Sequence, residues 1–535
     1  MHMVATVPMG RRARLWAFGG LMLAGLMSSL DATVLGTALP AIVGDLGGLD
    51  RIAWVSTAYV LATSVTVPLS GRLGDLFGRR PVLLTGLIGF LAGSAACGAA
   101  PGMDWLIAFR VVQGAAAGCL MSSMFAVTGD LFEPRERAKY QGYSALIFAV
   151  SSIAGPLVGG FLTDHASWRW VFYANMPLGI AATAATLLFL RLPEPAGRPR
   201  IDYPGIVLLG AAVTCFTLLT SWAGTRYAWG SPVVLALAAG AAVLFAVWVL
   251  AERRAAEPVI PPALFLDRSF GVACVVAAAG GATGFGLATY LPMFFQVVGG
   301  VDATRSGLLL LPMMLALLAA SMGAGRRIHR TGRYHRLPAA SMAVSLAGIA
   351  LLATMDAGTS LLTAGCYMAV LGFGAGLSQQ VVVLIAQNAA PQRDLGAASS
   401  GVFATRMLGT AAGMAVFGAI MTNRFAEEVV RRVPDGRAPA FADAVRPEVL
   451  ATLPGPVRDG VAAAFADAFS GVFTAALPVL LLGLAAALLL RDVPLAPRAA
   501  SRRGRRRGRA ARSAPGCSGP ASPAGATRTP SRWRR

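Results

Sequence analysis

Three fully charged side chains interrupt otherwise apolar stretches of this sequence: Asp31, Arg110 and Arg406. Charge in hydrocarbon costs at least about 2.5–3.5 kcal/mol, so we expect each of them to face the protein interior. Desolvation penalises a carboxylate there, whereas a nearby cation stabilises it, so conformation or a bound molecule can change its proton occupancy. Proton coupling is therefore the chemistry that Asp31 permits, and a static ion pair is the structural alternative.

Asp31 and Arg110 are predicted to lie at similar depth in a membrane. Asp31 is about 24 Å from the inner boundary by helical rise, and Arg110 is about 8 Å below the outer one. In a hydrocarbon core of roughly 30 Å these depths coincide, so the two side chains can pair. Arg406 is about 10 Å from the inner side, where it either lines a cavity or bonds to backbone carbonyls.

The elements that carry these residues are predicted to be transmembrane helices. Of the 535 residues, 56% are hydrophobic and only 13% are charged, and the mean hydropathy is +0.64. A helix needs about 20 apolar residues to cross the hydrocarbon core. Fourteen stretches meet this requirement: 15–35, 52–70, 81–100, 105–128, 141–163, 170–190, 204–222, 231–250, 270–298, 306–325, 337–354, 358–379, 399–422 and 469–490. The fold class is therefore an all-α polytopic membrane protein.

The net charge of +21 is explained by its placement in the chain. With both termini inside, the inner segments hold 34 of the 46 Lys and Arg residues and the outer loops hold 10. The positive-inside rule therefore predicts cytoplasmic termini, an even number of spans and a location in the cytoplasmic membrane. Nucleic acid is not an expected partner, whereas the lipid bilayer is.

Two connecting segments indicate an internal repeat. GRLGDLFGRR at 71–80 and GRRIHRTGRY at 325–334 share Gly or Arg at four of ten positions and join helices on the same membrane face. The repeat predicts two six-helix halves with an inserted pair of helices. Parallel repeats of this kind place a cavity between the halves. The expected divisions are a cytoplasmic N-terminus (1–14), the first half (15–190), a linker with the inserted pair (191–269), the second half (270–490) with an extracellular loop (423–468), and a disordered basic cytoplasmic tail (491–535).

Several motifs together resemble the major facilitator superfamily, in particular its fourteen-helix drug:proton antiporters of the EmrB/QacA type. GRLGDLFGRR is similar to the superfamily's signature loop, and FRVVQG at 109–114 resembles its helix-four arginine motif. SSIAGPLVGG at 151–160 resembles the antiporter motif, LDATVLGTALP at 30–40 the first-helix motif, and SWRWVFYANMPLG at 167–179 the junction of the fifth and sixth helices. The resemblance covers most of the chain up to about residue 491.

The resemblance implies export of drugs or other small lipophilic molecules in exchange for protons. It implies coupling by Asp31 and Arg110, to which the sequence adds Arg406 as a candidate. The other implied site residues are Gly71, Asp75, Gly78, Arg79 and Arg80 in a conformational latch, and Gly155, Pro156, Gly159 and Gly160 in the antiporter motif.

Three positions depart from the family pattern. Gly36 stands where the family often has Asn, which puts a polar contact beside Asp31 in doubt. Ser151 replaces the Gly that usually begins the antiporter motif, a change between small residues that should still pack. The second-half counterpart of the latch has His329 in place of an acid, so only the first half keeps the anion.

Several other functions are disfavoured by the sequence. Lys139 is the only lysine, so no phosphate-binding G-x-x-x-x-G-K-[ST] loop exists and ATP is not an expected partner. The histidines 165, 329 and 335 lack metal-ligand spacing, so neither a metal nor another cofactor is expected, nor is an enzyme. We expect a monomer that binds a small molecule and protons. A proton-coupled uptake carrier and a non-transporting sensor or scaffold remain as alternatives.

Overall fold

A computed structural model describes residues 10–48, 51–192, 201–224, 226–255, 257–285, 287, 290–301, 303–433 and 453–490. The contacts divide the chain into a unit that ends at Leu495 and a second unit, 496–535. All described residues belong to the first unit. The expected basic tail (491–535), most of the expected N-terminal segment and the middle of the expected loop (434–452) lie outside the described residues.

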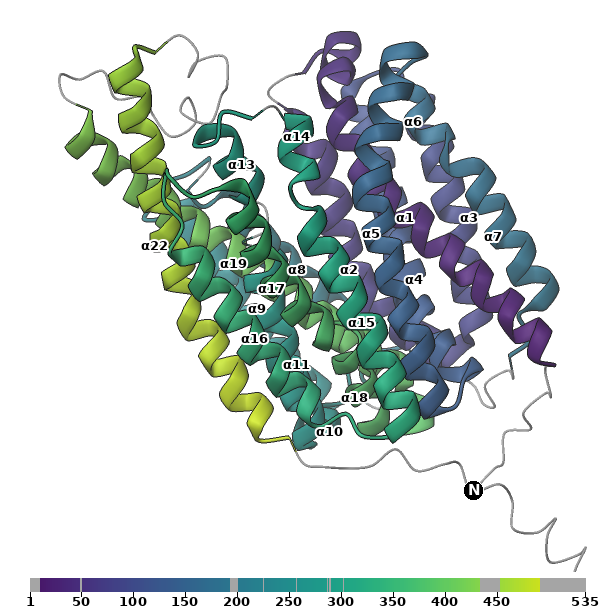
Figure 1. The fold of residues 1–535 in the computed structure, drawn as a ribbon. Coiled ribbons are helices and arrows are strands. Elements are labelled where there is room, and N and C mark those ends of the chain that lie inside the picture. Colours follow the sequence, from purple (N-terminus) through teal and green to yellow (C-terminus); the bar gives the residue numbers. More distant parts are fainter. Residues whose placement is uncertain are drawn as a thin grey trace, which may run out of the picture. The chain divides into compact units, whose positions relative to one another are not determined.

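The described residues form helices and contain no β-strand (Figure 1). In the first half these are α1 (Arg11–Leu46), α2 (Ile52–Phe77), α3 (Arg79–Gly98), α4 (Met103–Leu131), α5 (Pro134–His165), α6 (Arg169–Tyr173) and α7 (Asn175–Phe189), followed by the inserted pair α8 (Tyr203–Trp222) and α9 (Pro232–Glu252). The second half contains α10 (Pro262–Leu266), α11 (Arg268–Gly280), η2 (Gly281–Phe285), α13 (Tyr290–Val297), α14 (Ala303–Leu308), α15 (Leu311–Thr331), α16 (Arg336–Ala353), α17 (Leu361–Ser378), α18 (Val381–Ala389), η3 (Gln392–Asp394), α19 (Leu395–Arg432) and α22 (Gly455–Leu488).

Thirteen helices among the described residues are long and apolar enough to cross a membrane. Thirteen of the fourteen expected stretches correspond to them. The ninth, 270–298, is not one continuous helix: α11 leads into the π-helical turn η2, and α13 follows it. Gly280, Gly281 and Gly284 lie at this break, and glycine is a poor helix former because its backbone loses the most freedom on folding.

The two ends of the helical bundle can be named by their residues. The Gly78 end is where α2 meets α3, and the Gly102 end is where α3 leads into α4. The expected loop 71–80 is mostly helical, because α2 continues to Phe77 and α3 begins at Arg79. Gly78 alone separates them, with a φ of 95° that favours glycine.

The second half repeats this arrangement. Residues 332–335 separate α15 from α16, and the first of them, Gly332, has a φ of 70°, which favours glycine as at Gly78. The halves also meet in matching pairs, since α2 packs on α19 and α5 packs on α15. Glycine permits both contacts: a Cβ at Gly71 would lie 2.7 Å from the Gly396 carbonyl oxygen, and one at Gly325 would lie 2.5 Å from that of Ala138. The repeated motif therefore marks the surfaces by which the halves close on each other.

The expected loop 423–468 is shorter than the sequence suggests. Helix α19 continues to Arg432 and α22 already begins at Gly455. Phe425 on α19 and Phe465 on α22 are buried and pack edge to face, with ring centroids 6.3 Å apart. The extensions persist because their apolar side chains pack against each other, although this part of the sequence is too polar to count as a span.

Both ends of the described chain lie at the Gly78 end of the bundle (Figure 1). Phe18, near the start of α1, packs against Phe132 just after α4. At the other end of the chain, α22 runs antiparallel to α16: its Ser470 hydroxyl donates to the Ala353 carbonyl, and its Gly483 lies against Met342. The two described ends thus lie at the same end of the bundle, which is the arrangement that an even number of crossings requires.

Candidate transport site

Asp31 and Arg110 form an ion pair inside the first half. Arg110 Nη1 lies 2.7 Å from Asp31 Oδ2, and each residue is only 1% exposed. Helix α1 supplies the acid and α4 supplies the base at the same depth, so the pairing expected from helical rise is present. Breaking such a pair by removing one partner leaves an uncompensated buried charge, which costs about 3–5 kcal/mol.

Two neutral side chains complete the hydrogen bonding of the Asp31 carboxylate. Gln113 Nε2 and Asn175 Nδ2 each donate to Asp31 Oδ1 at 2.9 Å. Gln113 lies three residues after Arg110 on the same face of α4 and also accepts from Arg110 Nη1 at 2.8 Å. Both amides are fully buried. The sequence analysis missed them, although each lies in a quoted motif and is a polar residue in an apolar stretch.

Arg110 is held from its other sides by α2. Its Nε donates to the Val55 carbonyl oxygen at 3.2 Å, and its guanidinium carbon lies 4.1 Å from the centroid of the Tyr59 ring. A cation over an aromatic face is stabilised by the ring quadrupole. The arrangement therefore fixes the position of the arginine from α2 and that of the carboxylate from α4 and α7.

The antiporter motif on α5 packs directly against α1, close to Asp31. A Cβ at Gly155 would lie 2.7 Å from Thr33 Cβ, and one at Gly159 would lie 2.7 Å from the Val34 carbonyl oxygen. Thr33 also donates a hydrogen bond to the Ser151 carbonyl at 2.9 Å. Gly160 differs, because a Cβ there would meet nothing within 4 Å. Close contact between the two helices thus depends on Gly155 and Gly159.

Pro156 and Gly36 lie at the edges of this interface. Pro156 is inside α5 and exposed. Gly36 is exposed as well, and a Cβ there would meet nothing within 4 Å. Asp31 therefore does not depend on position 36 for a polar partner. The Asn175 amide on α7, which the sequence analysis did not consider, provides one.

The latch residues join the two halves at the Gly78 end. Asp75 accepts hydrogen bonds from the backbone N–H groups of Gly396 (3.0 Å) and Ala397 (2.8 Å), at the first turn of α19. A carboxylate at a helix N-terminus satisfies free N–H groups and complements the helix dipole. Arg79 holds the carboxylate at 2.7 Å and also lies 2.8 Å from Asp130.

Arg72 and Arg80 play different parts in this region. Arg72 crosses to the second half, where its Nη1 lies 3.1 Å from Asp394, and it also pairs with Glu257 after α9. Arg80, expected in the latch, instead donates to the Leu187 carbonyl at 2.9 Å, within the first half. At this end Gly71, Arg72 and Asp75 thus contact the start of α19 or the residue before it, Arg79 holds the Asp75 carboxylate, and Gly78 provides the turn.

A second contact between the halves was not recognised from the sequence. Gln387 on α18 accepts hydrogen bonds from Arg137 (3.3 Å) and Gln141 (3.1 Å) on α5. It donates to the Phe125 carbonyl of α4 at 3.1 Å and to the Ser399 hydroxyl at 2.7 Å. Glutamines at the edges of apolar stretches carry no distinctive sequence signal, so only their convergence in space identifies the cluster.

Arg406 lies apart from the Asp31–Arg110 pair, in the second half. It donates to the Gln379 backbone carbonyl, at the break between α17 and α18, and it lines a pocket. Of the two alternatives expected for Arg406, the bond to a backbone carbonyl is present, and the pocket that it lines is not the expected cavity. The pocket is formed by second-half residues alone, from α11, η2 and α15 to α19, whereas the sequence analysis expected the cavity between the halves.

No group of three or more His, Cys, Asp or Glu side chains in the described part of the chain is arranged to hold a metal ion. The described polar clusters instead consist of ion pairs and amides inside a helical bundle. Two repeated halves, a buried ion pair between an acid and an arginine, and hydrogen-bonded contacts between the halves are typical of a class of protein: multi-pass membrane transporters.

Comparison with known proteins gives the family. The sequence model of the Major Facilitator Superfamily matches residues 21–414, and the chain belongs to this superfamily. The multidrug transporter protein MdtP of Bacillus subtilis (strain 168) is 38% identical over 76% of this chain and 75% of its own length. Multidrug resistance protein 3 of the same strain is 35% identical over 77% of this chain and 80% of its own length.

More distant likenesses agree with this placement. An MFS-type efflux pump of Arthroderma benhamiae is 30% identical over 78% of this chain and 79% of its own length. The crystal structure of the human organic anion transporter MFSD10 superposes with a TM-score of 0.59 at 16% identity, covering 87% of this chain and 99% of that one. At such low identity this likeness concerns the fold alone. The named relatives are transporters, not enzymes.

Proposed function

We propose that this chain is a proton-coupled antiporter of the fourteen-helix drug:proton type, which exports small lipophilic molecules across the cytoplasmic membrane. The observation that carries the proposal is the buried Asp31–Arg110 pair with its two amide donors. The multidrug transporters and the efflux pump among the relatives favour export of drug-like molecules. The energy source is the proton gradient, with no cofactor.

The proposed coupling depends on a change of partners at Asp31. In this conformation three donors, on Arg110, Gln113 and Asn175, stabilise the ionised carboxylate. A proton that binds to Asp31 removes the charge that holds Arg110, and the pair then no longer ties α1 to α4. Because α5 packs on α1 through Gly155 and Gly159, a shift of α1 moves the helix that also contacts the second half.

The proposed conformational cycle opens and closes the Gly78 end, which we assign to the cytoplasmic side. Here that end is held closed by Asp75 on the first turn of α19 and by Gln387 against α5. Closure at one end with release at the other is the rigid-body alternation expected of two repeated halves. Release of the latch is the step that admits substrate from the cytoplasm.

Transport in everted vesicles tests this function. We expect a proton gradient to drive uptake of a panel of lipophilic dyes and drugs into vesicles that contain the native protein. Asp31→Asn keeps the shape of the side chain and removes its titration, so gradient-dependent transport should be lost while counterflow exchange of labelled substrate persists. Unchanged gradient-driven transport by this variant would refute the coupling role.

The same vesicles separate the proposal from its rivals. Accumulation in right-side-out vesicles when the outside is acidic would indicate a proton-coupled uptake carrier. If the native protein transports none of the compounds, and Asp31→Asn behaves in the same way, the chain is a sensor or scaffold. Tyr140→Phe is a suitable control, since this ring packs on Phe132 at the Gly78 end, away from Asp31.

A further inference from the structure

The pocket in the second half contains a cation that the protein leaves without a counter-ion. The guanidinium of Arg406 donates one hydrogen bond, from Nη2 to the Gln379 carbonyl, and among the described residues no carboxylate lies within 4 Å of it. Asp31, by contrast, already has its cation in Arg110. A charge in this environment is costly unless something compensates it, so Arg406 has unused capacity to bind an anion.

A second unpaired polar group faces the same pocket. The Gln379 side chain lines it and is only 7% exposed. Its Oε1 is buried and has no hydrogen-bond partner among the described residues. Leaving a buried acceptor unsatisfied costs about 1–3 kcal/mol. A ligand that donates a hydrogen bond to this oxygen would remove the cost.

Both groups lie where helices are interrupted. Gln379 follows the end of α17, and Val381 begins α18. Next to Arg406, η2 packs on α19 and is a π-helical turn whose Thr283 and Gly284 also line the pocket. Interrupted helices are the usual way in which transporters present polar groups in the membrane, and π-helical turns are frequent at functional sites.

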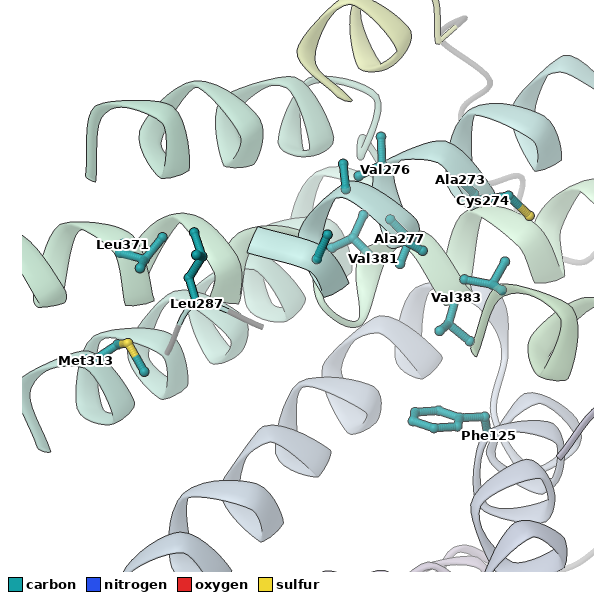
Figure 2. Packing of buried hydrophobic residues seen from close by; sticks show 14 of the residues in the cluster. Phe125, Ala273, Cys274, Val276, Ala277, Leu287, Met313, Leu371, Val381 and Val383 are labelled. Atoms are coloured by element: carbon teal, nitrogen blue, oxygen red, sulfur yellow. The ribbon is translucent and has the colours of Figure 1, made fainter. Parts of the chain in front are cut away.

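Apart from Ser345 and Ser378, the remainder of the pocket is apolar and adaptable. Met313, Met314 and Met342 line it together with Val276, Ala277 and Leu371. Figure 2 shows Val276, Ala277, Met313 and Leu371 on α11, α15 and α17. Methionine side chains fill irregular spaces and tolerate ligands of different shape. The lining thus fits a compact apolar body, of which one end must carry negative charge.

We propose that this pocket is the binding site for amphipathic organic carboxylates, with the carboxylate on Arg406 and a neighbouring hydroxyl or N–H group on Gln379 Oε1. The planar guanidinium suits a carboxylate because its N–H groups are arranged as a fork. This inference rests on the proposed transport function for its role and names the substrate class. The binding site itself does not depend on proton coupling.

Direct binding tests the proposal without a proton gradient. The probes are 6-hydroxy-2-naphthoate and three further small aromatic carboxylates, each paired with its methyl ester, titrated into the purified full chain in detergent and followed by fluorescence anisotropy. We expect the acids to bind at least about ten-fold more tightly than their esters, because an ester forms no charge-assisted hydrogen bonds. Equal affinity of acid and ester across all four pairs would overturn the proposal.

Variants separate binding from a purely structural role of Arg406. Arg406→Gln should abolish the preference for the acid while the ester still binds, which also shows that the pocket remains folded. Arg406→Lys should retain part of the preference, and Arg327→Gln, which removes an exposed charge from α15, should retain all of it. A preference that persists in Arg406→Gln would refute the site. If Arg406→Gln loses the preference for the acid over the ester but still exports substrate in an Asp31-dependent way, the substrate class alone is refuted.

Discussion

At the scale of single residues, three buried polar side chains around Asp31 in the first half all contact this one carboxylate. Asp31 receives an ion pair and two amide hydrogen bonds in a site that is closed to solvent. The second half has no matching acid among its described intramembrane residues: the Arg406 guanidinium donates to the Gln379 backbone carbonyl and not to a carboxylate. This asymmetry divides the work, with proton exchange proposed for the first half and anion binding for the second.

Tyr59 tests how much the position of Arg110 depends on the aromatic ring 4.1 Å from it. Tyr59→Phe keeps the ring and loses a long hydrogen bond to Ser28 of 3.4 Å, so it should transport like the native protein. Tyr59→Leu loses the cation–π contact, worth about 0.5–2 kcal/mol, and should lower both the melting temperature in detergent and the rate of gradient-driven transport. Equal behaviour of the two variants would show that the ring contributes nothing specific.

The Asp31–Arg110 pair could be predicted from the sequence because depth in a membrane follows from residue counting. Fourteen apolar stretches were also countable, since the length of a span is a local property. Gln113 and Asn175 were not predicted. A neutral amide in an apolar stretch costs less free energy than a charge does, so its presence there is a weaker sign of a buried partner. Their role becomes visible only when α4 and α7 are brought to the same side of α1.

At the scale of the helices, the errors of prediction have one physical cause. Hydropathy measures how far a segment is apolar, whereas a helix ends where its backbone hydrogen bonds find other partners. Helix α2 thus continues beyond residue 70 to Phe77, and α19 continues to Arg432. The opposite error occurs in the stretch 270–298, which is apolar throughout but contains the turn η2. The pocket could not be foreseen for the same reason, since η2 and the break at Gln379 line it.

The contact between α2 and α19 provides a matched test of the latch. A methyl group at Gly71 would lie 2.6 Å from Ser400 Cβ and 2.7 Å from the Gly396 carbonyl, whereas one at Gly74 would make an ordinary contact of 3.7 Å with Arg79. Gly71→Ala and Gly74→Ala gain the same helix propensity, so their difference isolates the contact. Overpacking costs about 1–3 kcal/mol, which shifts the equilibrium away from closure about 5- to 150-fold.

Spin labels at positions 77 and 393, both exposed at the Gly78 end, report this equilibrium as a distance distribution. We expect Gly71→Ala to populate longer distances and Gly74→Ala to match the native distribution. Identical distributions for the two variants would mean that the α2–α19 contact does not control closure. The spin-labelled protein without either substitution serves as the reference.

At the scale of the whole molecule, the halves differ in content but share one mode of contact. Gly71 on α2 faces α19, and Gly325 on α15 faces α5, so each half offers a glycine to a long helix of the other. The acid of the latch is present only in the first half, where Asp75 caps α19. In place of an acid, the α5 side uses amides, Gln141 with Gln387. The two contacts are unlike: the first contains the Asp75–Arg79 ion pair, whereas the second joins Arg137 and Gln141 to Gln387 by hydrogen bonds.

The number of crossings is the property of the whole chain on which the assignment of sides depends. If 268–297 crosses the membrane despite its interruption, both termini lie on the cytoplasmic side. In a background without other cysteines, we expect a membrane-impermeant maleimide on intact cells to label Gly307→Cys, where a side chain meets nothing within 4 Å. It should not label Leu266→Cys, which is 88% exposed before α11, or the native Cys517, until the membrane is permeabilised. Protection of both engineered sites with labelling of Cys517 would mean that this segment turns back, because an odd number of crossings then places the two termini on opposite sides.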